Sequence, residues 1–267
     1  MYYSMITTNG YFLTADNVTR LLKCKVIGYQ ITVDGLEKTH DKVRYAKGHG
    51  KTWSVIINNL RYIRDSIRTS TIRVMIRTNL TYDIYRERNE LFSFLKKEFG
   101  ADRRFSIFVH LAQDWGRLKD PSIKDRFCGV QEFYDTLESV ARVKLSTKLY
   151  YNFLQPAARI CYAAKKNFFM IMPDGKIGTC SCMLNENDNF YTCTDEWQTS
   201  NYQWDGISRL DKECLKCKKM PLCFGLVCPK HKGFITDTCG YELSDVEKLL
   251  RIIVQTDDRV KYWRRKV

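Results

Sequence analysis

The chain has 267 residues, 44% of them hydrophobic and 28% charged, and these proportions exclude a disordered or fibrous protein. Its formal charge is +14, but the basic residues are scattered, so charge alone does not predict a nucleic-acid partner. No run approaches the roughly 18 apolar residues of a membrane helix, and the N-terminal segment has no signal-peptide pattern. We therefore expect a cytoplasmic protein without a membrane partner, in which cysteines are more often metal ligands than disulfides.

In the first part of the chain, short β-rich runs alternate with helical patterns. Four strands are expected, in the segments SMITTNG, VIGYQITVDG, TIRVMIRTNLT and RRFSIFVHL. Helical periodicity falls on residues 14–24, about 51–66 and 84–98, with Thr14 or Asp16 as the N-cap of the first helix. Strands and helices that alternate in this way predict parallel βαβ units, which bind ligands at the carboxyl ends of their strands.

The second part of the chain is different in character. Residues 111–160 are expected to form a loop followed mostly by helix, and the isolated Cys24 and Cys128 are expected to be packing residues. Nine of the eleven cysteines then lie between residues 161 and 239, where regular periodicity nearly disappears. A segment of this kind needs covalent or metal cross-links in place of a core. A helix is expected again beyond it, in LSDVEKLLRIIVQT.

Four of these cysteines lie close together in CLKCKKMPLCFGLVCPK. Cys214 and Cys217 form a C-x-x-C pair, which chelates one centre in both zinc ribbons and iron–sulfur proteins. A zinc ribbon requires a second short pair, whereas here single cysteines follow at longer gaps. The number of thiols suits two four-ligand iron–sulfur clusters or two zinc sites, and the count alone does not separate these alternatives.

The order of the cysteines resembles a known family signature. Cys161 is followed by Gly175, Cys180, the four-cysteine segment and Cys239, and this order looks like the seven-cysteine signature of the SPASM domain. That domain is the C-terminal extension of radical S-adenosylmethionine (SAM) enzymes that modify peptides, such as anaerobic sulfatase-maturing enzymes and peptide maturases. The segment MIMPDGKIGTC is similar to the family's hairpin, in which Asp174-Gly175 turns one strand into the next.

The first part of the chain resembles the radical SAM partial (β/α)6 barrel. ITTNGYFLT and ITVDGLEKTHDKVR look like its third and fourth strands with the elements that follow them. In that family the fourth strand usually ends Ser-Leu-Asp-Gly and is followed by His-Asp-x-x-Arg. The corresponding residues here are Thr32, Val33, Asp34, Gly35, His40, Asp41 and Arg44.

The resemblance implies two auxiliary [4Fe–4S] clusters and a SAM site. The cluster nearer the barrel would have the ligands Cys161, Cys180 and Cys228, with Cys182 or Cys193 as an extra ligand. The second cluster would have the ligands Cys214, Cys217, Cys223 and Cys239. At the strand ends, Thr32 would contact the ribose of SAM and Arg44 its carboxylate.

The sequence departs from the family pattern in four ways. The radical-generating C-x3-C-x2-C motif does not occur in these residues, so we expect a fragment, a truncated gene product or a degenerate member with another role. Four residues separate Cys223 from Cys228, where three are usual, and no second cysteine follows Cys161 closely. Ser181 stands where sulfatase-maturing members have an aspartate, which favours a different peptide modification.

The expected fold class is α/β. Its parts are a partial radical SAM barrel with the last four strands (1–110), a helical linker (111–160), an irregular cysteine-rich SPASM domain (161–241) and a C-terminal helix with a basic tail (242–267). By resemblance, the chain belongs to an enzyme that modifies a peptide or protein by SAM-derived radical chemistry, with flavodoxin or ferredoxin as electron donor. No residue is assigned as catalytic. The alternative is a non-enzymatic zinc-binding module that binds nucleic acid.

Overall fold

The computed structural model describes residues 4–48, 50–112, 121–146, 150, 168–178, 190–191, 215–218, 220–223 and 246–256. The chain divides into two compact units. The first consists of residues 1–114, 118–151 and 243–267, and the second of residues 115–117 and 152–242.

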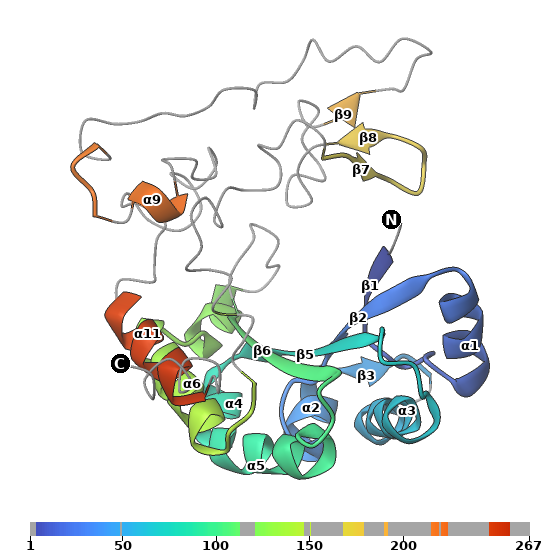
Figure 1. Cartoon of the computed structure of the whole chain (residues 1–267), viewed down its shortest axis with the longest axis horizontal. Helices are drawn as coiled ribbons and strands as arrows, with labels where there is room; N and C mark the ends of the chain where they lie inside the picture. Colours follow the sequence, from blue (N-terminus) through green and yellow to red (C-terminus); the bar gives the residue numbers. More distant parts are fainter. Residues whose placement is uncertain are drawn as a thin grey trace, which may run out of the picture. The chain divides into compact units, whose positions relative to one another are not determined.

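A four-stranded parallel sheet organises the first unit (Figure 1). Its strands, in pairing order, are β1 (Ser4–Thr8), β2 (Val26–Thr32), β5 (Arg73–Leu80) and β6 (Phe105–Leu111). The four strands predicted from the sequence are therefore confirmed, and so is their parallel arrangement. Because every strand points the same way, the carboxyl ends of all four lie along one edge of the sheet.

Seven α-helices of this unit lie in the described part of the chain: α1 (Ala15–Lys23), α2 (Glu37–Val43), α3 (Trp53–Ser66), α4 (Tyr82–Arg86), α5 (Arg88–Phe99), α6 (Val130–Arg142) and α11 (Val246–Thr256). A short 3₁₀ helix, η1 (Pro121–Arg126), precedes α6. The Thr14 hydroxyl caps α1 by accepting a hydrogen bond from the N–H of Asn17 at 3.4 Å, as predicted.

Two parts of this unit differ from the expectation. Helix α2 follows β2, and a hairpin of β3 (Tyr45–Ala46) and β4 (Gly50–Lys51) joins it to α3. No helical pattern had predicted α2. The single helix expected over 84–98 is two helices, because α4 ends and α5 begins on either side of Glu87.

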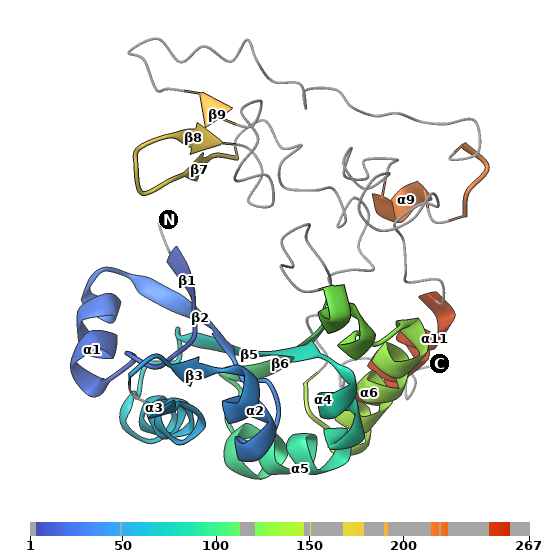
Figure 2. The ribbon, with the colours of Figure 1, turned by 180° about the vertical axis from the view of Figure 1, so that it is seen from behind.

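One face of the sheet packs on helices, with α2, α3 and α5 on the same side (Figures 1 and 2). In β5, the residues facing them are Val74, Ile76, Thr78 and Leu80, each at most 1% exposed. Apolar side chains of α3 and α5 fill the layer, including Ile57, Leu60, Ile63, Leu91 and Leu95, each fully buried. Burial of each such side chain stabilises the fold by about 1.5–3 kcal/mol, so this layer holds the strand ends in place.

The opposite face of the sheet, called the polar face below, carries Thr7, Gln30, Thr32, Arg77, Asn79 and His110. The strand register sets Thr32 opposite Arg77, and Asn79 opposite His110. Partners in register lie on the same face of a sheet. Most of these polar side chains stand in the carboxyl-terminal halves of their strands, which is where α/β sheets bind ligands.

A tyrosine closes the edge of the sheet at β6. The hydroxyl of Tyr150 accepts a hydrogen bond from the N–H of Val109 at 2.6 Å and donates one to the carbonyl of Val109 at 2.9 Å. Both backbone groups point away from β5, and without Tyr150 they would be buried and unpaired.

The expected C-terminal helix is confirmed as α11 (Val246–Thr256), which packs on α6. Its apolar residues Leu249, Ile252 and Ile253 are at most 2% exposed.

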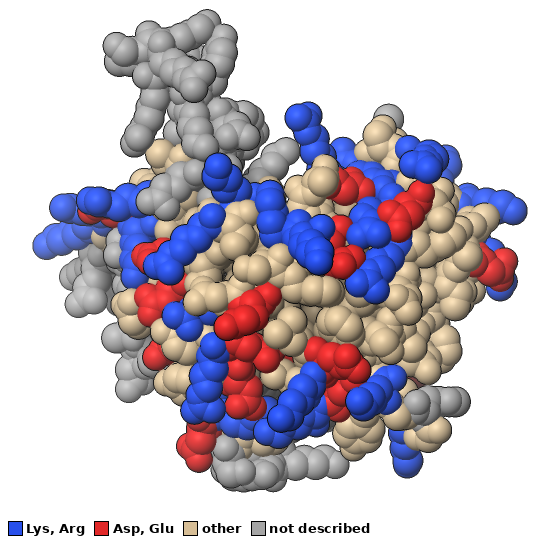
Figure 3. Space-filling view, turned by 90° about the horizontal axis from the view of Figure 1, so that it is seen from below, with Lys and Arg blue, Asp and Glu red and all other residues tan. Residues whose placement is uncertain are grey.

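Among the described residues, no helix combines the length and the hydropathy needed to cross a membrane. The face shown in Figure 3 carries Lys and Arg interspersed with Asp and Glu.

The second unit contains a small antiparallel sheet of β7 (Met170–Ile171), β8 (Ile177–Gly178) and β9 (Phe190–Tyr191). The hairpin between β7 and β8 is the one predicted at Asp174-Gly175, and Gly175 has the positive φ (+83°) that such a turn requires. The carboxylate of Asp174 accepts a hydrogen bond from the N–H of Lys176 at 3.2 Å. A short helix, α9 (Met220–Cys223), lies in the four-cysteine segment.

Candidate functional site

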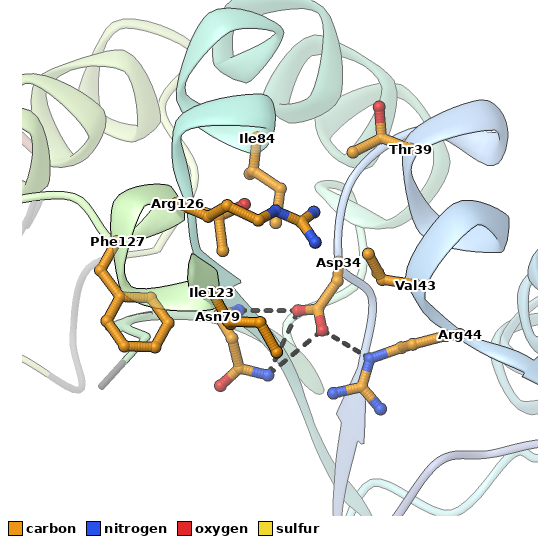
Figure 4. A pocket seen from close by; sticks show the side chains of 10 residues that line it. Asp34, Thr39, Val43, Arg44, Asn79, Ile84, Ile123, Arg126 and Phe127 are labelled. Carbon is orange, nitrogen blue, oxygen red and sulfur yellow. Dashed lines mark hydrogen bonds and ion pairs between the residues drawn. The ribbon is translucent and has the colours of Figure 1, made fainter. Parts of the chain in front are cut away.

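A pocket of about 350 Å³ lies at the carboxyl ends of β2 and β5 (Figure 4). Asp34 and Asn79 line it from the two strands, and Arg44 lines it from the end of α2. Arg126, the last residue of η1, and the following Phe127 line it as well. The pocket therefore combines charged groups with apolar walls, as small-molecule sites do.

Asp34 is the charged centre of this pocket. Its carboxylate accepts hydrogen bonds from the backbone N–H of Asn79 at 2.7 Å and from Nε of Arg44 at 2.5 Å. The side-chain nitrogen of Asn79 lies 3.3 Å from both carboxylate oxygens. Asp34 is only 6% exposed, and this set of donors compensates the cost of burying its charge. Asp34 thus ties the end of β2 both to β5 and to the end of α2.

His40 fixes the backbone of Asp34 through a hydrogen bond. Its Nδ1 accepts a hydrogen bond from the N–H of Asp34 at 3.1 Å, and its Nε2 lies 3.2 Å from the hydroxyl of Thr52. That hydroxyl donates its hydrogen to the carbonyl of Arg44 at 2.6 Å, so Nε2 must be the donor to Thr52. The imidazole is therefore neutral, with its hydrogen on Nε2. Burial lowers the pKa of His40, and nearby Arg44 lowers it further against the opposing effect of Asp34 and Asp41.

Asp41 fixes the start of α3. Its Oδ1 accepts hydrogen bonds from the backbone N–H groups of Thr52 and Trp53, both at 2.9 Å, and so caps the helix. Its Oδ2 is buried, and no hydrogen-bond partner for it occurs in the described part of the chain. The indole nitrogen of Trp53 donates to the carbonyl of Gly35 at 3.3 Å. These contacts connect α2, α3 and the end of β2 into one rigid corner.

The turn after Asp34 requires glycine. Gly35 has a φ of +101°, and a Cβ at this position would lie 2.4 Å from Oε1 of Glu87. The same carboxylate accepts hydrogen bonds from the N–H of Leu36 at 2.7 Å and from the hydroxyl of Thr39 at 2.8 Å. Glu87, at the junction of α4 and α5, therefore binds the N-terminal end of α2.

The two expected SAM-binding residues lie on different elements, Thr32 at the end of β2 and Arg44 directly after α2. Arg44 lines the pocket with its guanidinium bound to Asp34 through Nε. Thr32 is 8% exposed and ends β2 on the polar face. No hydrogen bond of the Thr32 hydroxyl, or of the two terminal nitrogens of Arg44, occurs among the described residues. Both groups therefore keep hydrogen-bonding capacity for a ligand.

Most of the expected metal ligands lie outside the described residues. They are Cys161, Cys180, Cys182, Cys193, Cys214, Cys228 and Cys239. Cys223 is the last residue of α9, and its side chain is also outside the described part. Cys217 has an exposed, free thiol. Within the described ranges, no three His, Cys, Asp or Glu side chains are grouped as a metal site.

The two isolated cysteines have different surroundings. Cys128 is 8% exposed, as expected of a packing residue, and burial with the nearby Glu132 raises the pKa of its thiol to about 12. The expectation for Cys24 is wrong, because Cys24 ends α1 and its side chain is exposed. The residue after it, Lys25, has a φ of +60°, so the chain leaves the helical conformation there.

Sequence reasoning missed Asn79, Arg77 and Glu87, which all contribute to this corner. Arg77 and Asn79 alternate with buried residues in the second half of β5, and this alternation marks them as polar-face residues at a strand end. Nothing near Glu87 in the sequence indicates its role, since its partners lie about 50 residues earlier in the chain.

Comparison with known proteins places this fold. No family model matches the chain, and no curated protein matches it. Among solved structures, the chain is similar to native anSMEcpe with bound AdoMet, with a TM-score of 0.67 and 14% identity over 99% of this chain and 76% of the other. Native anSMEcpe with bound AdoMet and Kp18Cys peptide gives the same values. The complex with AdoMet and Cp18Cys peptide gives a TM-score of 0.66 and 15% identity. The chain thus has a fold similar to that of anSMEcpe, whose structures contain bound AdoMet.

Proposed function

We propose that the chain is a radical SAM/SPASM-type iron–sulfur protein, part of an enzyme that modifies a peptide or protein. The observation that carries this proposal is the likeness of almost the whole chain to structures that hold AdoMet. The pocket at the strand ends supports it, because Asp34, His40 and Arg44 form one connected arrangement there. C-x3-C-x2-C is absent from the 267 residues, so for them the proposal is SAM binding and auxiliary clusters.

The pocket and the neighbouring polar face carry side chains that suit SAM. Arg44 offers two terminal nitrogens for a carboxylate, while Asp34 holds the guanidinium in place through Nε. Thr32 offers a hydroxyl for a ribose, and its strand partner Arg77 lies on the same face. When bound, SAM supplies radical chemistry in enzymes of this kind. The chain's own residues orient it, and Asp34 with His40 keeps Arg44 at a fixed depth in the pocket.

The cysteine set supports two auxiliary [4Fe–4S] clusters. One would use Cys161, Cys180 and Cys228, and the other Cys214, Cys217, Cys223 and Cys239. Cys217 fits this role because it is exposed, free and not in a disulfide. The clusters would replace the missing core of this segment and pass electrons from a donor such as flavodoxin or ferredoxin.

A peptide is the substrate class that we propose. A solved structure with a similar fold contains a bound peptide beside AdoMet. Ser181 in place of the family's aspartate supports a modification other than sulfatase maturation. We also propose a cytoplasmic location, since free thiols such as Cys217 persist under reducing conditions.

The test of SAM binding is titration calorimetry on the anaerobically prepared full chain. Wild type is expected to bind SAM, and Arg44→Gln to weaken binding by about 10-fold or more, because a charged hydrogen-bond donor is lost. The matched control is Arg86→Gln, which removes an arginine whose side chain is 77% exposed, in α4. Arg86→Gln is expected to leave the affinity unchanged. Absence of SAM binding by wild type would contradict the proposal.

A further inference from the structure

The polar face carries a second arginine connected to the same pocket. Nε of Arg77 donates a hydrogen bond to Oδ1 of Asn79 at 2.8 Å. The amide nitrogen of Asn79 in turn approaches the carboxylate of Asp34, which binds Arg44 on its other side. The four side chains form one row, Arg77–Asn79–Asp34–Arg44, with two positive charges and one negative charge.

Both arginines in this row are held in the same way. Each uses Nε for its contact within the row, so the two terminal nitrogens of each guanidinium are left over. In the part of the chain that the structure describes, these nitrogens make no hydrogen bond or ion pair. A guanidinium fixed through Nε presents a planar fork that matches the two oxygens of a carboxylate.

The positive charge of the Arg77 guanidinium is only partly compensated by the negative charge near it. Arg77 is partly buried between Thr32 of β2 and Phe108 of β6, its register partners. Burial lowers the pKa of Arg77, Asp34 acts in the opposite direction, and Arg44 adds to the lowering. A partly desolvated positive charge of this kind is stabilised when an anion binds to it. Because the row carries a net charge of +1, a single carboxylate neutralises it.

We propose that Arg77 and Arg44 form a two-fork carboxylate-binding site, with Arg77 binding from the polar face. The identity of the ligand rests on the proposed function. That function offers two sources of the carboxylate, namely the methionine end of SAM and an acidic side chain of the peptide substrate. The site itself depends only on the row of four side chains.

The test measures three ligands by titration calorimetry on the anaerobically prepared full chain. The probes are SAM, decarboxylated SAM, and the tripeptide acetyl-Gly-Asp-Gly-amide. Arg77→Gln removes the fork, and Arg77→Lys keeps the charge without the fork. The matched control is Arg73→Gln, which removes a charge from the same strand and face, four residues earlier and so roughly 13 Å away. Thermal melts check that each variant is folded.

If Arg77→Gln binds SAM about 10- to 100-fold more weakly than wild type does, and its affinity for decarboxylated SAM is unchanged, the site binds the carboxylate of SAM. The same loss for the tripeptide, with SAM unchanged, would assign it to the peptide. In either case Arg77→Lys should recover only part of the affinity. Tripeptide binding that depends on Arg77 in a protein that does not bind SAM would retain the site but contradict the proposed function. The site is overturned if Arg77→Gln behaves like Arg73→Gln with every probe, or if wild type binds none of the three.

Discussion

The backbone N–H of Asp34 donates a hydrogen bond to Nδ1 of His40, 3.1 Å away. This contact can form only when Nδ1 carries no hydrogen, so it requires a neutral imidazole. Protonation of His40 would place two N–H groups against each other directly beneath the pocket. The position of Asp34, and with it the position of Arg44, therefore depends on the protonation state of a buried histidine.

This dependence predicts a stability that falls at acidic pH. Burial lowers the pKa of His40 in the folded state, so between that pKa and about 6.5 the unfolded chain binds a proton that the folded chain does not. The stability of wild type relative to His40→Gln should decrease as pH falls below about 6.5, by at most about 1.4 kcal/mol per pH unit. Urea unfolding at several pH values measures it. His110→Gln is the companion variant, because burial also lowers the pKa of His110. A difference independent of pH from 7.5 to 5 would contradict this account.

Gly35→Ala should destabilise the chain through two separable effects. The alanine would have to adopt a strained positive φ, and its Cβ would lie 2.4 Å from Oε1 of Glu87. We therefore expect the free energy of unfolding to fall by roughly 2–3 kcal/mol. Gly48→Ala is the matched control, because Gly48 has a φ of +80° but, among the described residues, no atom beyond its chain neighbours lies within 4 Å of its Cβ position. It should cost only the backbone strain, about 1 kcal/mol. Equal losses for the two variants, measured by urea unfolding, would show that the contact with Glu87 is unimportant.

Asp34→Asn tests the charge at the centre of the pocket. The change leaves Arg44 without its carboxylate and Arg77 without nearby compensation. Since the Arg44 side chain is 35% exposed, solvent screens part of the loss, and we expect roughly 2 kcal/mol of destabilisation. Asp65→Asn, which removes the exposed partner of Arg64, should leave the unfolding midpoint nearly unchanged. The prediction fails if the two midpoints shift equally.

Tyr150→Phe should weaken the edge of the sheet. The change removes the hydroxyl that pairs with both backbone groups of Val109, and two buried polar groups lose their partner. We expect a loss of about 1–3 kcal/mol in the free energy of unfolding. Tyr45→Phe removes a hydroxyl from a side chain that is 70% exposed, and should have little effect. Faster amide hydrogen exchange at Val109, in Tyr150→Phe alone, would locate the change at β6.

The sequence predicted the sheet because its strands and main helices are determined locally. Ile56, Ile57, Leu60 and Ile63 recur at helical spacing, and the same residues form the buried side of α3. Asn9-Gly10 and Asp34-Gly35 end the expected segments SMITTNG and VIGYQITVDG, and both glycines have a positive φ. The positions of Asp34, His40 and Arg44 after β2 followed instead from the resemblance of ITVDGLEKTHDKVR to a family motif.

The missed features depend on contacts between distant residues. Helix α2 has only seven residues and no side-chain cap of its own, and Glu87 supplies its N-terminal partners from about 50 residues away. No local periodicity can reveal such a helix. The row from Arg77 to Arg44 likewise joins two strands and a helix, and it becomes visible only when the register sets β5 beside β2.

The account as a whole is tested most directly by metal analysis of the anaerobically purified chain. We expect a brown protein with about eight iron atoms per chain, the content of two [4Fe–4S] clusters. Cys217→Ser should lose about half of this iron, whereas Cys24→Ser, which changes an equally free and exposed thiol outside the ligand set, should retain it. A colourless protein with about two zinc ions per chain would contradict the account and favour the zinc-binding alternative.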